Sequence, residues 1–173
     1  DQIEKERAGS YQIEVLAKSK EHEVPITLRF QELRDEQMQP AHGELPFFLQ
    51  ENTVIQFLQY PYEQVVAENF VEILEKMELI NDLSCYEEIY GILKKEALDG
   101  RKVEQQIIEI GTKRELFFGK DRLDTVLHYK DYTYMKRKWT AYLKRERKKE
   151  PDWVEVMTLL EAFFPPVWRA IIR

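Results

Sequence analysis

YPYEQVVAENFVEILEKMELINDLSCYEEIYGIL, residues 60–93, contains the strongest helical pattern in this chain. Its first part repeats apolar residues at intervals of three and four, as one face of an amphipathic helix does; they are Tyr62, Val66, Phe70, Ile73, Met77 and Ile80. A second helix is expected after residues 81–83, where Ser84 and Glu87 have the spacing of a capping box. Two helices joined by so short a turn are expected to pack antiparallel.

Further helices are expected from residue 100 onward. Val103, Ile107 and Ile110 mark a third helix, and Gly111 is expected to close it as a C-cap glycine. The apolar spacing over residues 128–142 fits either one long helix or two shorter ones broken near residue 131.

Prolines bracket the last expected helix. Pro151 is expected to open it, because the first turn of a helix tolerates a missing N–H. Pro165 and Pro166 are expected to end it, because a proline removes a helix hydrogen bond and its ring clashes with the preceding turn.

Residues 1–59 have the alternation of strands rather than the period of helices. Residues 11–17, 24–30 and 53–58 are strand candidates, with a hairpin joining the first two. Residues 37–45 are expected to form a loop, because they contain Pro40 and Gly43. The predicted fold is therefore α+β, with a small antiparallel sheet portion over 1–59 and a bundle of about five helices over 60–173.

Composition indicates a soluble, cytoplasmic protein. No stretch approaches the roughly 20 apolar residues that span a bilayer, and the single cysteine, Cys85, excludes an internal disulfide. Residues 1–100 hold 21 acidic and 9 basic residues, whereas residues 101–173 hold 11 acidic and 17 basic ones. The basic part, residues 101–173, could attract a polyanion or an acidic partner. An equal alternative is that the opposite charges of the two parts compensate each other within the chain.

Two patterns in the helical part match one known family. The first is Tyr60-x-x-Glu63-x-x-Val66-Ala67-Glu68, followed by the aromatic-rich helix IYGIL at 89–93. The second is the terminal series of Trp139 and FFPPVW at 163–168. Together they resemble the AbiEii/AbiGii nucleotidyltransferase toxins, which have a Y-x-x-E-x-x-x-A-E-K segment, an R-D-x-x-D helix and a terminal W…F-x-P-V pattern. The resemblance covers roughly residues 60–168.

The resemblance implies transfer of a nucleotide to tRNA or another RNA, in a toxin–antitoxin or phage-defence system. Such an enzyme is expected to use a nucleoside triphosphate, Mg²⁺ held by an Asp-x-Asp pair, and an antitoxin protein as a partner. This chain contains no Asp-x-Asp. Gly9-Ser10 followed by Glu21-His22-Glu23 has the spacing of the family's Gly-Ser and acidic pair. The residues between them alternate as a strand, whereas the motif needs a helix, so we expect no metal site there.

Glu68 and Asn69 are the catalytic candidates that the resemblance implies. Glu68 matches the family's glutamate, and Asn69 stands where the family has a lysine. Glu88 matches the second acid of the R-D-x-x-D motif, whereas Ser84 and Cys85 replace its first two residues. The alternative is that Glu68 is a solvated helix residue without a catalytic role.

A dense basic stretch over residues 136–149 is the candidate RNA contact. Basic side chains on one side of a helix suit phosphates, and the candidates are Lys136, Lys138, Arg145, Lys148 and Lys149. The alternative is a solvated face, with Trp139 pointing into the core. The three histidines have no metal-ligand spacing. A function of a different class, a non-catalytic helical protein-interaction module, stays open, and binding of a nucleoside triphosphate would separate the two.

Overall fold

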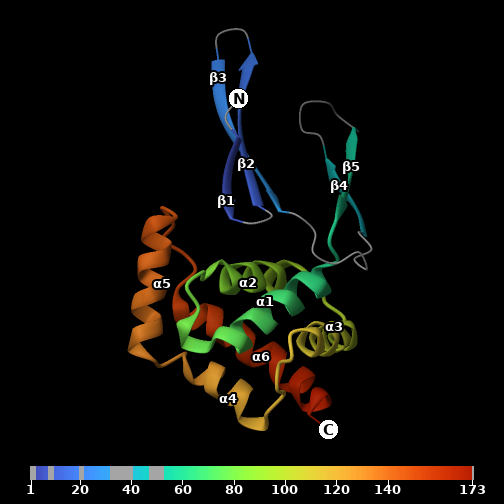
Figure 1. Cartoon of the computed structure of the whole chain (residues 1–173), viewed down its shortest axis with the longest axis vertical. Helices are drawn as coiled ribbons and strands as arrows, with labels where there is room; N and C mark the ends of the chain where they lie inside the picture. Colours follow the sequence, from blue (N-terminus) through green and yellow to red (C-terminus); the bar gives the residue numbers. More distant parts are fainter. Residues whose placement is uncertain (1–2, 8–9, 20–21, 32–40, 47–52, 173) are drawn as a thin grey trace. The chain divides into compact units, whose positions relative to one another are not determined.

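The computed structural model describes residues 3–7, 10–19, 22–31, 41–46 and 53–172. The chain divides into two compact units, Asp1–Gln39 and Pro40–Arg173. The first unit holds strands, and the second holds a hairpin and the helices (Figure 1). The fold is α+β, as predicted. The unit boundary comes before the second hairpin, whereas the sequence predicted a division at residue 60.

The first unit contains a three-stranded antiparallel sheet in the order β1-β2-β3. Its strands are β1 (Ile3–Arg7), β2 (Ser10–Ser19) and β3 (His22–Gln31). Val15 pairs with Ile26 in the β2–β3 ladder, so the apolar residues of both strands share one face of the sheet. The predicted hairpin is confirmed.

A second hairpin, β4 (Ala41–Pro46) with β5 (Val54–Gln59), corrects part of the prediction. Residues 41–45, expected to be a loop, pair with β5, while residues 37–40 lie outside the described part. Gly43 lies opposite Phe57, and a Cβ at Gly43 would come within 2.6 Å of the Phe57 ring. The glycine therefore gives room to an aromatic neighbour and does not mark a loop.

Six α-helices and one 3₁₀ turn, joined by short connections, follow β5 in the described residues. They are α1 (Tyr62–Lys76), the 3₁₀ turn η1 (Met77–Leu79), α2 (Ser84–Lys95), α3 (Gly100–Lys113), α4 (Lys120–His128), α5 (Thr133–Arg145) and α6 (Trp153–Ile171). Helix α6 packs against α2, α3, α4 and α5, and α1 packs against α2, α3 and α4 (Figure 1). All of these helices are too short or too polar to span a bilayer, as far as the described residues extend.

Helices α1 and α2 pack antiparallel, as predicted. Asn69 contacts Glu88, whereas Glu72, one turn further along α1, interacts with Cys85, one turn earlier in α2. Helix α1 ends before the last two residues of its predicted stripe. Met77 has a positive φ of 51°, and buried Ile80 follows η1.

The predicted capping box at the start of α2 is wrong. The Asp82 carboxylate accepts a hydrogen bond from the Ser84 N–H at 3.0 Å. Ser84 is the first residue of α2 and makes no side-chain cap. The Glu87 carboxylate instead binds Lys148, 61 residues away.

Gly111 lies inside α3 and does not close it, which corrects the predicted C-cap. A Cβ at this position would lie 2.4 Å from the Phe118 ring. Helix α3 continues to Lys113, and its C-cap residue is Arg114. The glycine is a contact point that lets the segment after α3 fold back on the helix.

Gly111→Ala is expected to lower the free energy of unfolding by about 1–3 kcal/mol, because the added methyl group displaces the Phe118 ring. Gly91→Ala is the matched control, since Gly91 lies inside α2 and a Cβ there meets nothing within 4 Å. This control should be neutral or stabilise by up to ~1 kcal/mol through helix propensity. Equal effects of the two substitutions in urea unfolding would contradict the packing role of Gly111.

The region of residues 128–142 resolves into two helices, which is the second of the two predicted alternatives. Helix α4 ends at His128 and α5 begins at Thr133. The predicted stop at Pro165-Pro166 is wrong, because α6 runs through both prolines to Ile171. Phe164 and Trp168, on either side of the prolines, are both buried. Burial of this apolar face offsets the hydrogen bonds that the prolines cannot donate.

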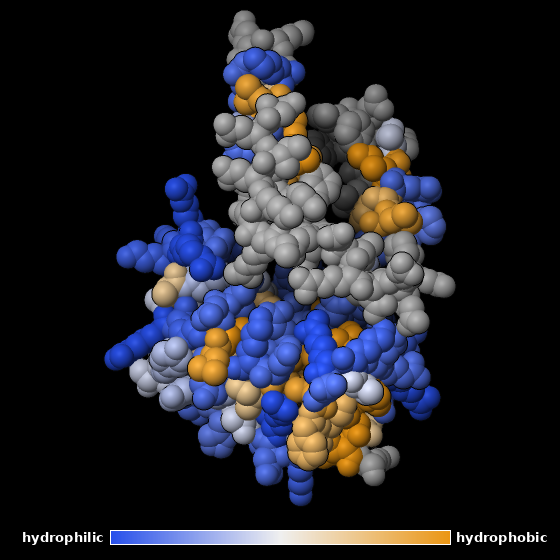
Figure 2. Space-filling model, viewed as in Figure 1, coloured by the Kyte–Doolittle hydropathy of each residue, from blue (hydrophilic) through white to orange (hydrophobic). Residues whose placement is uncertain are grey.

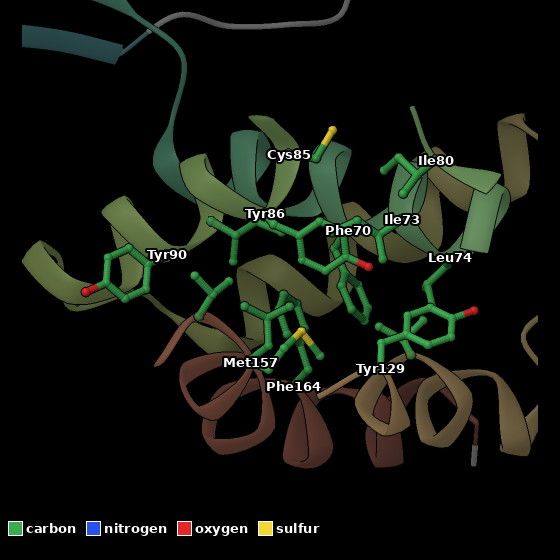
Figure 3. Packing of buried hydrophobic residues seen from close by; sticks show 14 of the residues in the cluster. Phe70, Ile73, Leu74, Ile80, Cys85, Tyr86, Tyr90, Tyr129, Met157 and Phe164 are labelled. Atoms are coloured by element: carbon green, nitrogen blue, oxygen red, sulfur yellow. The ribbon is translucent and has the colours of Figure 1, made fainter. Parts of the chain in front are cut away.

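The core lies between α1, α2 and α6 and includes buried residues of α3, α4 and α5. Figure 3 shows Phe70 of α1 directed toward Phe164 and Met157 of α6, with Tyr86 of α2 beside them. The Phe70 and Phe164 rings stack with centroids 3.7 Å apart. Around this core, hydrophilic residues cover most of the surface that Figure 2 shows of the helices.

Candidate functional site

The positions singled out on α1 and α2 meet in the structure. Asn69 Nδ2 donates a hydrogen bond to Glu88 Oε2 at 2.8 Å. Glu68, one residue earlier, accepts from Gln64 Nε2 at 3.4 Å within α1. Glu68 is partly buried, and Glu88 is exposed. An amide beside a carboxylate can orient it by hydrogen bonding but contributes no charge.

Cys85 lies beside this contact and is buried. Burial, followed by the charges of Glu72, Asp82 and Glu88, raises the pKa of its thiol to about 12. A thiol that stays protonated at neutral pH is a poor nucleophile. The structure therefore gives Cys85 a packing role.

The acids of α1 and α2 are already engaged by neighbouring side chains. Glu72 accepts from Lys76 Nζ at 2.5 Å, and Glu88 accepts from Asn69. Within the described ranges, no three acidic, histidine or cysteine side chains form a group that could hold a metal ion. The α1–α2 contact therefore does not fit a Mg²⁺ ion.

The Gly-Ser and acidic pattern near the start of the chain falls partly outside the described residues, which omit Gly9 and Glu21. Ser10 begins β2, and Glu23 lies in β3 with its side chain exposed. The intervening segment is a strand, as predicted, and not the helix that the nucleotidyltransferase motif needs.

Two of the predicted RNA-contacting lysines lie on α5 and have partners within the protein. Lys136 Nζ lies 3.9 Å from Asp131 Oδ1. Lys138 Nζ donates to the backbone oxygen of Glu78 at 3.1 Å and to that of Ile80. The expectation that Lys138 faces water is wrong, because its ammonium group satisfies carbonyls at the end of η1 that lack helix partners.

The other three predicted contacts lie at or beyond the end of α5, which corrects the expected continuous helix. Arg145 is the last residue of α5 and pairs with Glu146 at 3.0 Å. Lys148 lies in the turn that follows and contacts both oxygens of Glu87, at 2.7 and 2.8 Å. Lys149 is exposed. Within the described part of the chain, neither Lys149 nor the nearby exposed Lys144 has an acidic partner.

Glu87 joins α2 to the end of α5. Besides Lys148, it accepts a hydrogen bond from the Tyr142 hydroxyl. Burial raises the pKa of the Glu87 carboxyl, but the hydrogen bonds from Lys148 and Tyr142 and the charge of Lys148 outweigh it, so the net pKa lies below its usual value. No local spacing signals this contact, because Lys148 is 61 residues away.

The lowered pKa of Glu87 predicts a loss of stability in acid. Its contribution is present above the ordinary glutamate pKa of ~4.3 and disappears as the pH falls through the lower folded-state value. Glu87→Gln should lower the free energy of unfolding at pH 7 by about 1–2 kcal/mol and flatten its decline between roughly pH 5 and 3. Urea unfolding at several pH values checks this. Glu96→Gln, at an exposed position just after α2, should change it by less than ~0.5 kcal/mol.

The sequence reading also missed a hollow along α4 and the turn after it. It has a volume of about 600 Å³ and is lined by Asp121, Asp124, Thr125, His128, Tyr129, Asp131 and Tyr132. The signal was present, since Asp121, Asp124 and His128 recur at the three- and four-residue spacing of one helix face.

Compared with protein-family models, curated proteins and solved structures, the chain has no significant match in any of the three.

Proposed function

We propose that this chain supplies the helical portion of an AbiEii-like nucleotidyltransferase that transfers a nucleotide to an RNA acceptor. The observation that carries the proposal is the hydrogen bond between Asn69 and Glu88. Asn69 stands at the lysine position of the first family motif, and Glu88 stands at the second acid of the R-D-x-x-D motif. The antiparallel packing of α1 and α2 brings these two positions together. In this chain the hydrogen bond between them joins the two helices.

The proposed enzyme takes Mg²⁺ and a nucleoside triphosphate at a catalytic centre outside the described residues. Such a centre needs an Asp-x-Asp pair, which this sequence lacks. We therefore expect this chain alone to transfer no labelled nucleotide to tRNA with Mg²⁺ or Mn²⁺. Transfer that disappears in Glu21→Gln/Glu23→Gln would contradict this assignment. An Asp-x-Asp after a Gly-Ser turn elsewhere in the encoded protein would support it.

Contact with the RNA acceptor is proposed for the end of α5 and the turn after it. The exposed side chains Lys144, Arg145 and Lys149 lie within six residues of one another. Lys136, Lys138 and Lys148 belong to the same basic stretch but already contact groups of this chain. The RNA-contacting set therefore centres on Lys144 and Lys149, together with Arg145, whose side chain stays 63% exposed beside its partner Glu146.

Binding of tRNA tests this set. If three to five phosphates are contacted, raising the salt concentration fourfold should weaken binding by roughly one and a half to two and a half orders of magnitude. Lys144→Glu/Arg145→Glu/Lys149→Glu should weaken binding at low salt and flatten the salt dependence. The matched control is Lys95→Glu/Arg101→Glu/Lys102→Glu, which reverses three exposed charges elsewhere. Equal losses in the two triple variants would mean only generic polyanion attraction.

A non-catalytic protein-interaction module is the second candidate, with an antitoxin protein as one possible partner. The observation that favours it is the exposure of apolar side chains on one face of β2 and β3, including Val15, Val24 and Ile26. A face of this kind suits a protein partner. Binding of a nucleoside triphosphate by the encoded protein would favour the enzyme, because the module needs none.

A further inference from the structure

The hollow along α4 combines exposed aromatic surface with carboxylates. Tyr132 is 48% exposed and its ring lies 6.1 Å from that of Tyr129, with the two planes stacked. Tyr129 itself is buried and donates its hydroxyl hydrogen to Glu78 at 2.8 Å. The hydrogen bond and burial thus hold Tyr129 in place in the lining of the hollow, and Tyr132 presents an amphipathic ring beside it.

The charges at the hollow are predominantly negative. Asp121, Asp124 and Asp131 all line it and are exposed. Asp131 has a loose contact with Lys136 at 3.9 Å. No cation of the described residues pairs with Asp121 or Asp124.

Two nearby cations of the chain, Lys130 and Arg122, contact other groups. Lys130 pairs with Glu161 at 2.7 Å, and Arg122 donates to the backbone oxygens of Leu74 and Phe117, both at 3.0 Å. Apart from the Lys136–Asp131 contact, these cations therefore leave the negative charges of Asp121 and Asp124 at the hollow unpaired.

The next tyrosine already illustrates the type of contact that such a surface makes. Tyr134 follows Tyr132, with their rings 5.9 Å apart, and Lys138 Nζ lies over the Tyr134 ring at 5.3 Å from its centroid. A cation over a tyrosine ring is attracted by the negative face of the π system. Tyr132 offers an equivalent ring beside carboxylates, without such a cation among the described residues.

We propose that the α4 hollow binds a basic segment of a protein partner, with an arginine side chain placed between Tyr132 and the carboxylates of Asp121 and Asp124. The planar guanidinium can stack on the ring and also donate hydrogen bonds to a carboxylate. The volume of about 600 Å³ lies within the range of small-ligand sites and accommodates a short peptide stretch. Complementary charge at Asp121 and Asp124 selects a basic occupant.

The test is a calorimetric titration of the whole chain with a capped Arg-Ala-Arg peptide, carried out at low and at high salt. A capped Gln-Ala-Gln peptide of the same length is the control ligand and should not bind. Asp121→Asn/Asp124→Asn should weaken arginine-peptide binding by about three- to tenfold. Glu96→Gln/Glu104→Gln, which removes two carboxylates outside the hollow, should leave it unchanged.

Two substitutions of Tyr132 separate the ring from the hydroxyl group. Tyr132→Ala should weaken binding by about two- to fivefold, whereas Tyr132→Phe, which keeps the ring, should retain it. Equal melting temperatures show that each variant is folded. Binding unaffected by the Asp121→Asn/Asp124→Asn change, or no binding at low salt, overturns the proposal. Sedimentation showing self-association that this double variant abolishes also overturns it, because the occupant is then the basic segment of a second copy.

Discussion

Phe70→Ala is expected to lower the free energy of unfolding by about 3–5 kcal/mol. Phe70 is fully buried. Its ring stacks on Phe164 at 3.7 Å and meets the edge of Trp168 at 6.2 Å. Truncation removes these contacts and leaves a cavity where α1 crosses α6, and the surrounding helices can close it only in part.

Urea unfolding followed by circular dichroism measures this loss. Phe117→Ala is the control, because Phe117 is 79% exposed and its truncation should cost less than ~0.5 kcal/mol. A loss below ~1 kcal/mol for Phe70→Ala would mean that the core does not lie between α1 and α6.

Trp139→Ala is expected to cost a similar ~3–5 kcal/mol. Trp139 is buried on α5 and its ring lies 5.7 Å from that of Trp153. Its indole Nε1 donates to the backbone oxygen of Pro151 at 2.9 Å. The side chain therefore ties α5 to the start of α6 by both packing and a buried hydrogen bond.

Trp139→Phe separates these two contributions. It keeps an aromatic ring but removes the donor, which leaves the Pro151 carbonyl without this partner and should cost about 1–3 kcal/mol. Tyr134→Ala, on the exposed face of the same helix, should cost less than ~1 kcal/mol. Equal losses for Trp139→Ala and Tyr134→Ala in urea unfolding would contradict the buried position of Trp139.

The two substitutions also set a condition for the RNA experiment. Lys144 and Lys149 lie next to the segment that Trp139 anchors through Pro151. A change at Trp139 would disturb RNA binding by unfolding this segment, without any phosphate contact of its own. The charge-reversal variants are therefore compared at equal melting temperature, which keeps the two effects apart.

The local sequence pattern predicted most of the secondary structure. The three- and four-residue spacing through Val66, Phe70 and Ile73 predicted α1, and alternation predicted β2, β3 and β5. These elements follow from the sequence because each buries one face, and the period of that face is set by backbone geometry. The same reasoning placed Trp139 in the core.

Contacts between distant residues could not be predicted in this way. The sequence pattern predicts a helix end at Gly111, but this glycine makes room for the Phe118 ring. It also predicts a helix end at Pro165, but the buried side chains around this proline keep α6 continuous. Lys138 and Lys148 were predicted to contact RNA, with a solvated face as the alternative. In the structure Lys138 binds carbonyls of Glu78 and Ile80, and Lys148 binds the carboxylate of Glu87. In each case the deciding partner is remote in sequence or belongs to a face that only packing defines.

The sequence alone therefore determined the α+β class, the antiparallel pair α1–α2 and the apolar faces, because these depend on the spacing of neighbouring residues. Tertiary structure decided which charges remain available to a ligand. It joined Asn69 to Glu88, engaged Lys138 and Lys148 within the protein, and left Asp121 and Asp124 unpaired among the described residues. The physical reason is that a charged side chain pairs with whatever the fold brings within a few ångströms, and sequence distance does not limit that choice.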